Sequence, residues 1–295
     1  MDMRQRRPSL NREPQTTVEA LVARMDARND GAPVSDTVPT GFPSLDRMLA
    51  GGFRRQDLIV LAGDVGSGKS SLGLAIAIRS AQAGMPAVFL SGEMTEDRLM
   101  ERALALESRV PVDLLRSGAL DDVSRASVGA AALRLRDLPL QVRALAGERF
   151  SEITDALETV PRRTLIVLDS LQMAAPPFPA PGPDEAAAAT ARALKAVALD
   201  HDVAILALAQ LPGLRPGRRD PRPSLEDLGG LGVVKQVADV VLAIYREEMY
   251  RPGSGVEGAT ELLVEKNRNG AVGFVDLYFY HAWLRFEDMV DPDRP

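Results

Sequence analysis

The stretch that most limits the fold of this chain lies within residues 58–78, where an apolar run, a glycine-rich turn and an apolar helix pattern follow one another. The turn matches the pattern Gly63-x-x-x-x-Gly68-Lys69-Ser70. Glycines let backbone N–H groups approach an anion closely, and the start of a helix adds partial positive charge. The stretch therefore predicts a strand, a phosphate-binding loop and a helix; the alternative is a glycine turn without a ligand.

The residue types of this loop predict how it binds a nucleotide. Lys69 is expected to reach the β- and γ-phosphates, and the Ser70 hydroxyl to coordinate Mg²⁺. ATP and Mg²⁺ are the expected cofactors. The predicted nucleotide-binding residues are Gly63, Asp64, Val65, Gly66, Ser67, Gly68, Lys69, Ser70 and Ser71.

Apolar runs of strand length alternate with helix patterns along the rest of the chain. Strands are expected at 87–93, 138–142, 164–169, 203–209, 240–245, 262–266 and 274–280. Helices are expected at 96–106, around Leu114, and at 123–135, 153–160 and 185–199, with a Pro-rich loop at 176–183. This order predicts an α/β fold of the P-loop NTPase kind: a mostly parallel sheet flanked by helices, with a C-terminal antiparallel hairpin that turns at 267–270.

Polar residues stand where three of these strands end, which is where parallel sheets bind their ligands. Asp169 closes an apolar run and is expected to hold Mg²⁺ through water; its alternative is a capping or loop residue. Ser170 follows it, so a catalytic base must come from elsewhere, and Glu93 is the available carboxylate. Gln210 is expected to sense the γ-phosphate. A surface salt bridge and a polar strand end are the alternatives for Glu93 and Gln210.

Composition limits the partners and the location of the protein. No cysteine occurs, which excludes disulfides and fits a reducing cytoplasm, and no apolar run approaches the length of a membrane span. The net charge is −6, so nucleic-acid binding would require a local basic patch. His201 and His281 are isolated, without a metal-binding or nucleophilic constellation around either, and are interpreted as structural.

The chain is predicted to divide into three parts. Residues 1–36 are expected to be a disordered extension with an amphipathic linker helix, residues 37–288 the ATPase domain, and residues 289–295 a tail. The apolar stripe of the linker helix would pack on its own domain or on a neighbouring subunit. The stripe consists of Val18, Leu21, Val22 and Met25.

Together these motifs resemble the RecA-like ATPase domain of DnaB-type replicative helicases. The resemblance covers about residues 37–288. The motifs occur in the family's order, at spacings close to those of the family. The matching segments are 40–46, the P-loop, 91–95, 166–172, 207–211, 238–246 and 265–270.

The resemblance implies a homohexameric ring that encircles single-stranded DNA and moves 5′-to-3′ in replication, with ATP held between subunits. It implies a loader or a primase as further partners, and a linker helix that docks on the next subunit. Glu93 corresponds to the base, Asp169 to the Mg²⁺ acid and Gln210 to the γ-phosphate sensor. Lys266 and Arg268 correspond to basic fingers that reach a neighbour's site; without the resemblance they would be ordinary turn charges.

Two features depart from the family pattern. The family usually carries an N-terminal domain, whereas only about 36 residues precede the ATPase segment here. The family's DNA-gripping Arg-Glu-Ser-Gly is replaced by glycines at 229, 230 and 232. A basic loop precedes them, and it is either a second DNA grip or a solvated surface loop. The candidate DNA contacts are Arg215, Arg218, Arg219, Arg222, Gly229, Gly230 and Gly232.

Two other functions remain possible from the sequence. A RecA/KaiC-like ATPase would use its cycle for assembly or regulation without unwinding DNA, and the missing arginine favours it. A small-molecule P-loop kinase would have no use for finger residues acting on another subunit. The 211–232 loop distinguishes the first two: it faces DNA in a helicase and a partner or solvent in a regulatory ATPase.

Overall fold

The structure is a computed structural model that describes residues 14–30, 36–145, 150–174, 176, 178–212, 218–230, 232–253 and 255–289. The chain divides into two compact units between Asp36 and Thr37. The expectations for residues 1–13, for Arg215 and for 290–295 lie outside the described residues.

The described part of the first unit contains one helix, α1 (Pro14–Asn29), where the sequence predicts the linker helix. Its apolar stripe is exposed, from 49% at Leu21 and Val22 to 61% at Val18. What covers this stripe stays a prediction.

A nine-stranded sheet organises the second unit, in the order β11-β10-β9-β8-β3-β7-β6-β4-β5. The six strands from β8 to β5 are parallel, and β9, β10 and β11 add an antiparallel edge. The mostly parallel sheet with its C-terminal hairpin is thus confirmed. The strands are β3 (Leu58–Gly63), β4 (Ala87–Ser91), β5 (Leu140–Ala144), β6 (Leu165–Asp169), β7 (Ala204–Gln210), β8 (Val240–Tyr245), β9 (Ala259–Asn267), β10 (Gly273–Tyr280) and β11 (Arg285–Asp288).

The central strand β3 places the glycine-rich turn beside the ends of its neighbours. Every residue of β3 is buried, as expected for a parallel strand covered on both faces. Its pairing with β7 brings Gly63 opposite Gln210 at the carboxyl edge. Its pairing with β8 starts at the opposite edge, where Ile59 faces Val240.

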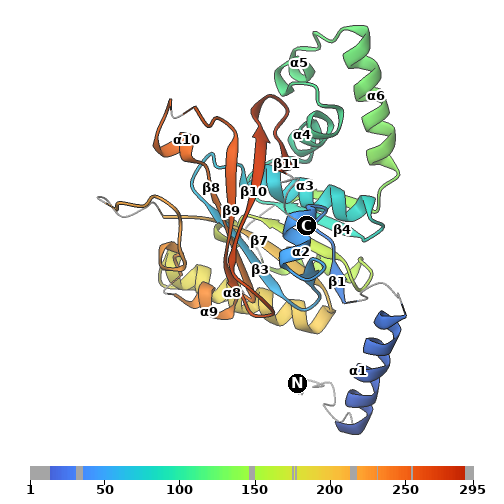
Figure 1. Cartoon of the computed structure of the whole chain (residues 1–295), viewed down its shortest axis with the longest axis vertical. Helices are drawn as coiled ribbons and strands as arrows, with labels where there is room; N and C mark the ends of the chain where they lie inside the picture. Colours follow the sequence, from blue (N-terminus) through green and yellow to red (C-terminus); the bar gives the residue numbers. More distant parts are fainter. Residues whose placement is uncertain are drawn as a thin grey trace. The chain divides into compact units, whose positions relative to one another are not determined.

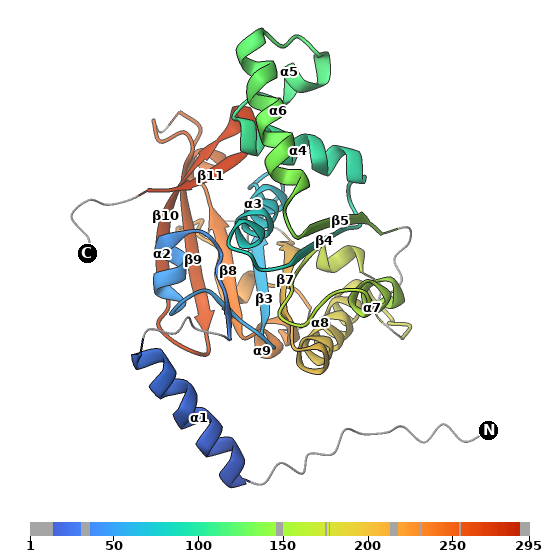
Figure 2. The same cartoon turned by 90° about the vertical axis from the view of Figure 1, so that its right-hand side faces the viewer.

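Helices cover both faces of the sheet and enclose two apolar cores (Figures 1 and 2). One face carries α2 (Pro43–Met48), α3 (Lys69–Gln82) and α4 (Glu96–Ser108), with α5 (Val112–Ser117) and α6 (Asp122–Arg136) packed beyond α4. The other carries α7 (Phe150–Glu158), α8 (Pro183–His201) and α9 (Val233–Val237). A short helix, α10 (Glu247–Tyr250), follows β8. No helix in the described part of the chain combines the length and hydropathy that a membrane span requires.

Several elements differ from the expectation. The ladder of β1 (Thr37–Val38) with β2 (Phe53–Arg54), the strand β11 and helix α9 were not predicted, because each is too short to show a period. Helix α8 begins within the Pro-rich segment, at Pro183, since proline fits the first turn of a helix. The strand predicted to reach Glu93 ends at Ser91, so Glu93 lies in the following turn.

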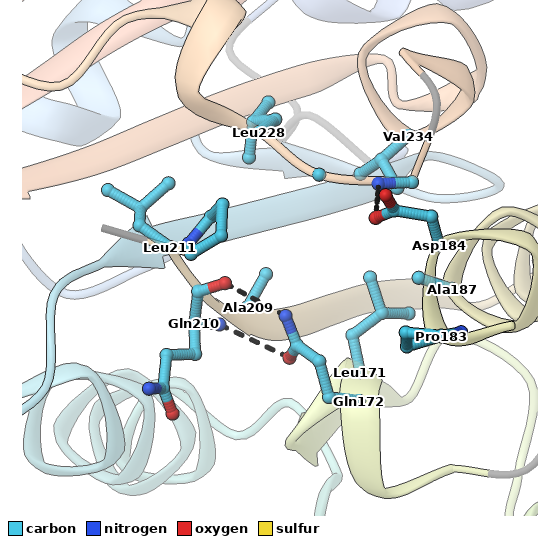
Figure 3. Close-up of a pocket in the computed structure, with 13 residues that line it drawn as sticks. Leu171, Gln172, Pro183, Asp184, Ala187, Ala209, Gln210, Leu211, Leu228 and Val234 are labelled. Carbon is cyan, nitrogen blue, oxygen red and sulfur yellow. Dashed lines mark hydrogen bonds between the residues drawn. The ribbon is translucent and has the colours of Figure 1, made fainter. Parts of the chain in front are cut away.

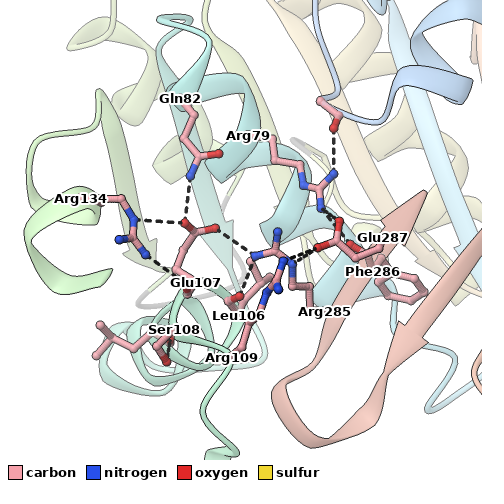
Figure 4. Close-up of polar contacts among 12 residues, drawn as sticks. Arg79, Gln82, Leu106, Glu107, Ser108, Arg109, Arg134, Arg285, Phe286 and Glu287 are labelled. Carbon is pink, nitrogen blue, oxygen red and sulfur yellow. Dashed lines mark hydrogen bonds and ion pairs between the residues drawn. The ribbon is translucent and has the colours of Figure 1, made fainter. Parts of the chain in front are cut away.

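A polar network joins β11 to α3 and α4 (Figure 4). Arg79 of α3 donates to the Phe286 carbonyl oxygen at 2.9 Å and to the Glu287 carboxylate at 2.7 Å. Arg285 donates to the Leu106 carbonyl oxygen at 2.9 Å and pairs with Glu287. These contacts hold β11 in place, and Phe286 with it, against the start of α3.

Candidate active site

The glycine-rich turn between β3 and α3 folds as a tight loop. Gly66 and Gly68 have left-handed φ angles of 77° and 99°. A Cβ atom on Gly68 would lie 2.8 Å from Cζ of Phe286, so a larger residue has no room there. Glycine at 68 is therefore required both by its backbone angle and by the packing of β11.

The Lys69 ammonium group lies inside this loop. It donates to the carbonyl oxygens of Gly63 at 3.0 Å and Asp64 at 2.8 Å. Burial lowers the pKa of Lys69, while the carboxylates of Asp169 and Glu93 oppose this shift. A cation in this position is ready to exchange carbonyl contacts for a phosphate group.

A cavity of about 390 Å³ opens in front of the loop at the carboxyl edge of the sheet. It brings together the P-loop, Glu93, Asp169 and Gln210, as the sequence predicts. Its volume lies in the range of small-molecule and cofactor sites. Its walls are Val65, Gly66, Gly68, Lys69, Ser70, Ser71, Glu93, Arg102, Asp169, Gln210, Arg246, Phe279, His281 and Leu284.

Asp169 provides a carboxylate suited to a divalent cation. The residue is 1% exposed, and its Oδ2 atom is buried without a partner. Burial raises the pKa of Asp169 to about 6, against a hydrogen bond with Ser70 that lowers it. Among the described residues, no group of three or more His, Asp or Glu side chains is arranged to hold a metal ion by itself. The Asp169 carboxylate and the Ser70 hydroxyl are oxygen ligands of the kind that suits Mg²⁺ bound to a nucleotide.

Glu93 and Gln210 reach the cavity from the carboxyl ends of β4 and β7, the two strands on either side of β6. The Glu93 side chain is exposed in the turn after β4, and Gln210 is the last residue of β7. The Gln172 amide was missed by the sequence analysis: it donates to the Gln210 carbonyl oxygen at 2.9 Å and accepts from the Gln210 N–H at 3.2 Å (Figure 3). Gln172 thus holds the backbone of Gln210, while the Gln210 side chain points away from Gln172 (Figure 3).

Three further polar residues of the cavity were not expected: Arg102, Arg246 and His281. Arg246 is 4% exposed, donates to the Gly66 carbonyl oxygen at 3.2 Å and lies 4.6 Å above the Phe279 ring. His281, interpreted from the sequence as structural only, lines the cavity with Nε2 2.9 Å from Nη2 of Arg246. Arg246 directly follows an apolar strand and ends the matching segment 238–246, whereas no motif of the sequence includes Arg102 or His281.

Lys266 and Arg268 do not lie at this cavity. They stand near the turn after β9, at the edge where β3 and β8 begin, opposite to the P-loop of the same chain. The Lys266 ammonium donates to the carbonyl oxygens of Lys235 and Ala238, each at 2.6 Å. Within one chain these side chains therefore contact carbonyl oxygens at the C-terminal end of α9 and have a structural role.

The basic loop is partly neutralised by acidic residues of the same unit. Arg218 pairs with Asp227. Arg222 donates to both carboxylate oxygens of Glu261, at 2.6 and 2.7 Å. Arg219, by contrast, is exposed.

The glycine segment after the basic loop is also held. The Gly230 N–H donates to the Asp184 carboxylate at 2.8 Å (Figure 3). Gly229 and Gly230 line a second cavity, of about 400 Å³, on the other side of Gln210.

The geometry agrees with the comparison to known families. The model of the family described as "DnaB-like helicase C terminal domain" matches residues 37–288. The chain belongs to this DnaB-like family.

Known DnaB proteins match the chain over most of its length. The replicative DNA helicase DnaB of Leifsonia xyli subsp. xyli (strain CTCB07) is 31% identical over 256 residues, which are 85% of this chain and 56% of that protein. The replicative DNA helicase DnaB of Pasteurella multocida (strain Pm70) is 30% identical over 299 residues, 97% of this chain and 64% of that protein. The chain thus spans less than two thirds of the length of these DnaB relatives.

Solved structures share the fold of this DnaB-like domain. A solved ATPase domain superposes with a TM-score of 0.85 at 24% identity, over 94% of this chain and all of that one. A DnaB-like replicative helicase studied with primase gives a TM-score of 0.84 at 22% identity, over 95% of this chain and 68% of that chain. The RecA-like α/β fold expected from the sequence is confirmed.

Proposed function

We propose that this chain is the motor domain of an ATP-dependent DNA helicase of the DnaB type, which hydrolyses ATP to move along single-stranded DNA. The observation that carries the proposal is the cavity that joins Lys69, Ser70, Asp169 and Glu93 in a chain of the DnaB-like family. The match to the DnaB-like helicase family favours a helicase domain over a small-molecule kinase.

The predicted site residues of the cavity have distinct roles in the proposed reaction. The P-loop N–H groups and Lys69 bind the phosphates of ATP, and Asp169 with Ser70 holds Mg²⁺. When bound, Mg²⁺ neutralises charge on the β- and γ-phosphates. Glu93 orients the attacking water and accepts its proton, while Gln210 contacts the γ-phosphate.

The assembly we propose is a homohexamer with ATP between subunits. Lys266 and Arg268 lie at the edge opposite to their own P-loop, which supports a role at the P-loop of a neighbouring copy, where cations stabilise transition-state charge. The exposed stripe of α1 would dock on the next subunit. Movement 5′-to-3′, a loader or a primase as partner and a cytoplasmic location belong to the same proposal.

Contact with DNA would come from the basic loop and the glycine segment after it. Arg219 is exposed and free to meet a phosphate, together with backbone N–H groups of Gly229 and Gly232. Arg218 and Arg222 would first have to leave Asp227 and Glu261.

The test is the ATPase rate with and without an oligo-dT strand across a salt series. We expect DNA to raise the ATPase rate. The DNA concentration that gives half of this effect should rise with the salt concentration. Arg219→Ala should lower the dependence of log affinity on log salt by about 0.7, the value of one single-strand phosphate contact. Arg136→Ala, which changes an exposed arginine of α6, is the matched control.

The alternative function predicts another result in the same assay. If ATP is hydrolysed but DNA changes nothing at low salt, the helicase proposal fails, and a RecA/KaiC-like ATPase without unwinding activity takes its place.

A further inference from the structure

The C-terminal end of α9 contacts both cations that the proposed function assigns to a neighbour's nucleotide, Lys266 and Arg268. The Lys266 ammonium donates to three carbonyl oxygens at 2.6, 3.2 and 2.6 Å, those of Lys235, Gln236 and Ala238. An ammonium group has three N–H donors. All of them are therefore engaged within the same chain.

Arg268 is held beside Lys266 by two acceptors. Its guanidinium donates to the Asp239 carboxylate at 2.9 Å and to the Gln236 carbonyl oxygen at 2.7 Å. Carbonyl oxygens at the end of a helix carry partial negative charge, which favours cations there. A phosphate group on another subunit therefore competes with α9 and Asp239 for the same two cations.

The N-terminal end of the same helix belongs to the glycine segment, which is part of the proposed DNA contact. Gly232 is the N-cap of α9, and the helix has only five residues, Val233–Val237. At 1.5 Å per residue, its two ends are about 7 Å apart. The Ala238 N–H donates to the Val234 carbonyl oxygen at 3.0 Å, which joins the following residue to the helix. Because so short a helix moves as one body, a shift of Gly232 also shifts the carbonyl oxygens that hold the two cations.

We propose that the C-terminal end of α9, together with Asp239, is a holding site for Lys266 and Arg268, which DNA bound at Gly232 opens. While the holding site is occupied, both cations stay away from the neighbour's nucleotide and hydrolysis is slow. DNA that contacts the glycine segment displaces α9, and the released cations then reach the phosphates. The inference rests on the proposed function, since it requires the cations to act on a neighbouring subunit. A ligand shifts such an equilibrium only if it binds one state more tightly, so DNA must bind more tightly to the released state.

The charge balance at Asp239 allows the holding site to be weakened or strengthened. Asp239 is 4% exposed, and its carboxylate also accepts from the Lys195 ammonium at 2.6 Å. Lys195 and Arg268 therefore share one negative charge. Asp239→Asn removes this charge and should release Arg268. Lys195→Met removes the competing cation, so Arg268 should be bound more firmly to Asp239.

The experiment compares the ATPase rate of the full chain at saturating ATP and Mg²⁺ with and without oligo-dT. Asp239→Asn should raise the DNA-free rate about 2- to 30-fold, and Lys195→Met should lower it by a similar factor. The rate at saturating DNA should change little in either variant, because DNA has already opened the holding site. Asp202→Asn, which changes a carboxylate paired with Arg55 at the edge where β3 and β7 begin, is the matched control and should leave both rates unchanged.

A double-mutant cycle shows whether Asp239 acts through Arg268. In the Arg268→Ala background, Asp239→Asn should no longer raise the DNA-free rate. A gain that persists there overturns the inference, as does a DNA-free rate that neither variant changes. Rate changes of the same sign in Asp239→Asn and Lys195→Met also overturn it, since a general loss of folding would produce them. If Asp239→Asn does not fold, Lys195→Met in the wild-type and Arg268→Ala backgrounds gives the same test with the opposite sign.

Failure of the proposed function gives a different result. A wild-type ATPase rate that oligo-dT does not change overturns the proposed function itself, as does an Arg268→Ala rate equal to that of wild type with DNA present. DNA stimulation that depends on Arg268 but not on the charge at Asp239 overturns only the holding site.

Discussion

The Arg268 guanidinium donates to the Asp239 carboxylate at 2.9 Å, at the edge of the sheet where β3 and β8 begin. Asp239 is buried, and it also accepts from the Leu58 N–H at 2.8 Å and from the Lys195 ammonium at 2.6 Å. Arg268 itself stays 48% exposed. The Asp239 carboxylate, itself fixed by two hydrogen bonds, thus holds the Arg268 guanidinium at the surface, where it is accessible to a second copy of the chain.

Arg268→Ala is expected to lower kcat for ATP by about 10³-fold or more, the usual effect of losing an arginine that acts on a neighbour's nucleotide. Nucleotide affinity should change far less, because the phosphates are held by the P-loop of the other subunit. Steady-state ATPase assays and titration with a fluorescent nucleotide measure the two effects. Arg251→Ala, at an exposed arginine of the same unit, is the control.

Mixing distinguishes action on a neighbour from action within one chain. Arg268→Ala and Lys69→Ala, each inactive alone, should regain part of the activity when mixed, because some interfaces then pair an intact P-loop with an intact Arg268. Full activity of Arg268→Ala alone would rule out a role in hydrolysis.

Glu93→Gln is expected to reduce kcat by about 10²- to 10⁴-fold, the contribution of a general base. The amide keeps the size of the side chain but cannot accept the proton of water. Binding of ATP should persist, since Glu93 is not among the groups that cradle the phosphates. Asp97→Asn, in the first turn of α4, is the control carboxylate; an active Glu93→Gln would place the base elsewhere.

Much of the candidate site followed from the sequence because its parts are local. The P-loop is one continuous segment, and Asp169 and Gln210 end apolar runs that parallel pairing brings to one edge. Strand order and burial then place these residues together without knowledge of side-chain packing.

The remaining residues could not be found in this way, since they depend on contacts distant in the sequence. Gln172 acts on the backbone of Gln210, and His281 reaches Arg246 only after β10 and β8 have joined the same sheet. The pairing of Arg222 with Glu261 likewise depends on how the loop folds back on β9. Neither the hydrophobic periodicity of the sequence nor a short sequence motif encodes such side-chain pairings.

Gly68→Ala should destabilise the chain more than Gly84→Ala. Both glycines have left-handed φ angles, 99° and 81°, so each alanine costs about 1–2 kcal/mol in backbone strain. Only at 68 does the new Cβ atom meet another group, 2.8 Å from Cζ of Phe286, whereas nothing lies within 4 Å at 84. We expect an additional loss of about 1–3 kcal/mol at 68 from overpacking. Urea unfolding measures the difference, and equal losses would show that Phe286 does not constrain the loop.

Asp169→Asn is expected to stabilise the nucleotide-free chain at pH 8 while abolishing ATP hydrolysis. Burial raises the pKa of Asp169 to about 6 in the folded chain, from 3.8 as the ordinary value. The folded chain therefore binds a proton that the unfolded chain has released, and its stability falls as pH rises from about 4 to about 6. A shift of this size corresponds to roughly 3 kcal/mol at most, because the carboxylate must be charged while buried, and the charges of Lys69 and Arg102 offset this cost only in part.

The neutral amide removes this cost, so the stability gain should be large at pH 8 and vanish below about pH 4, where both chains carry an uncharged group at 169. Burial also raises the pKa of Asp57 to about 6. Asp57 is present in both chains, so it does not affect the difference in stability between them. Urea unfolding at pH 4, 6 and 8 without nucleotide measures it. With Mg²⁺ and the β,γ-imido analogue of ATP added, wild type should become more stable than Asp169→Asn. A charged carboxylate that holds Mg²⁺ stabilises the folded chain through ligand binding, and an amide does not. A gain that is the same at every pH would show that the charge of Asp169 carries no folding cost.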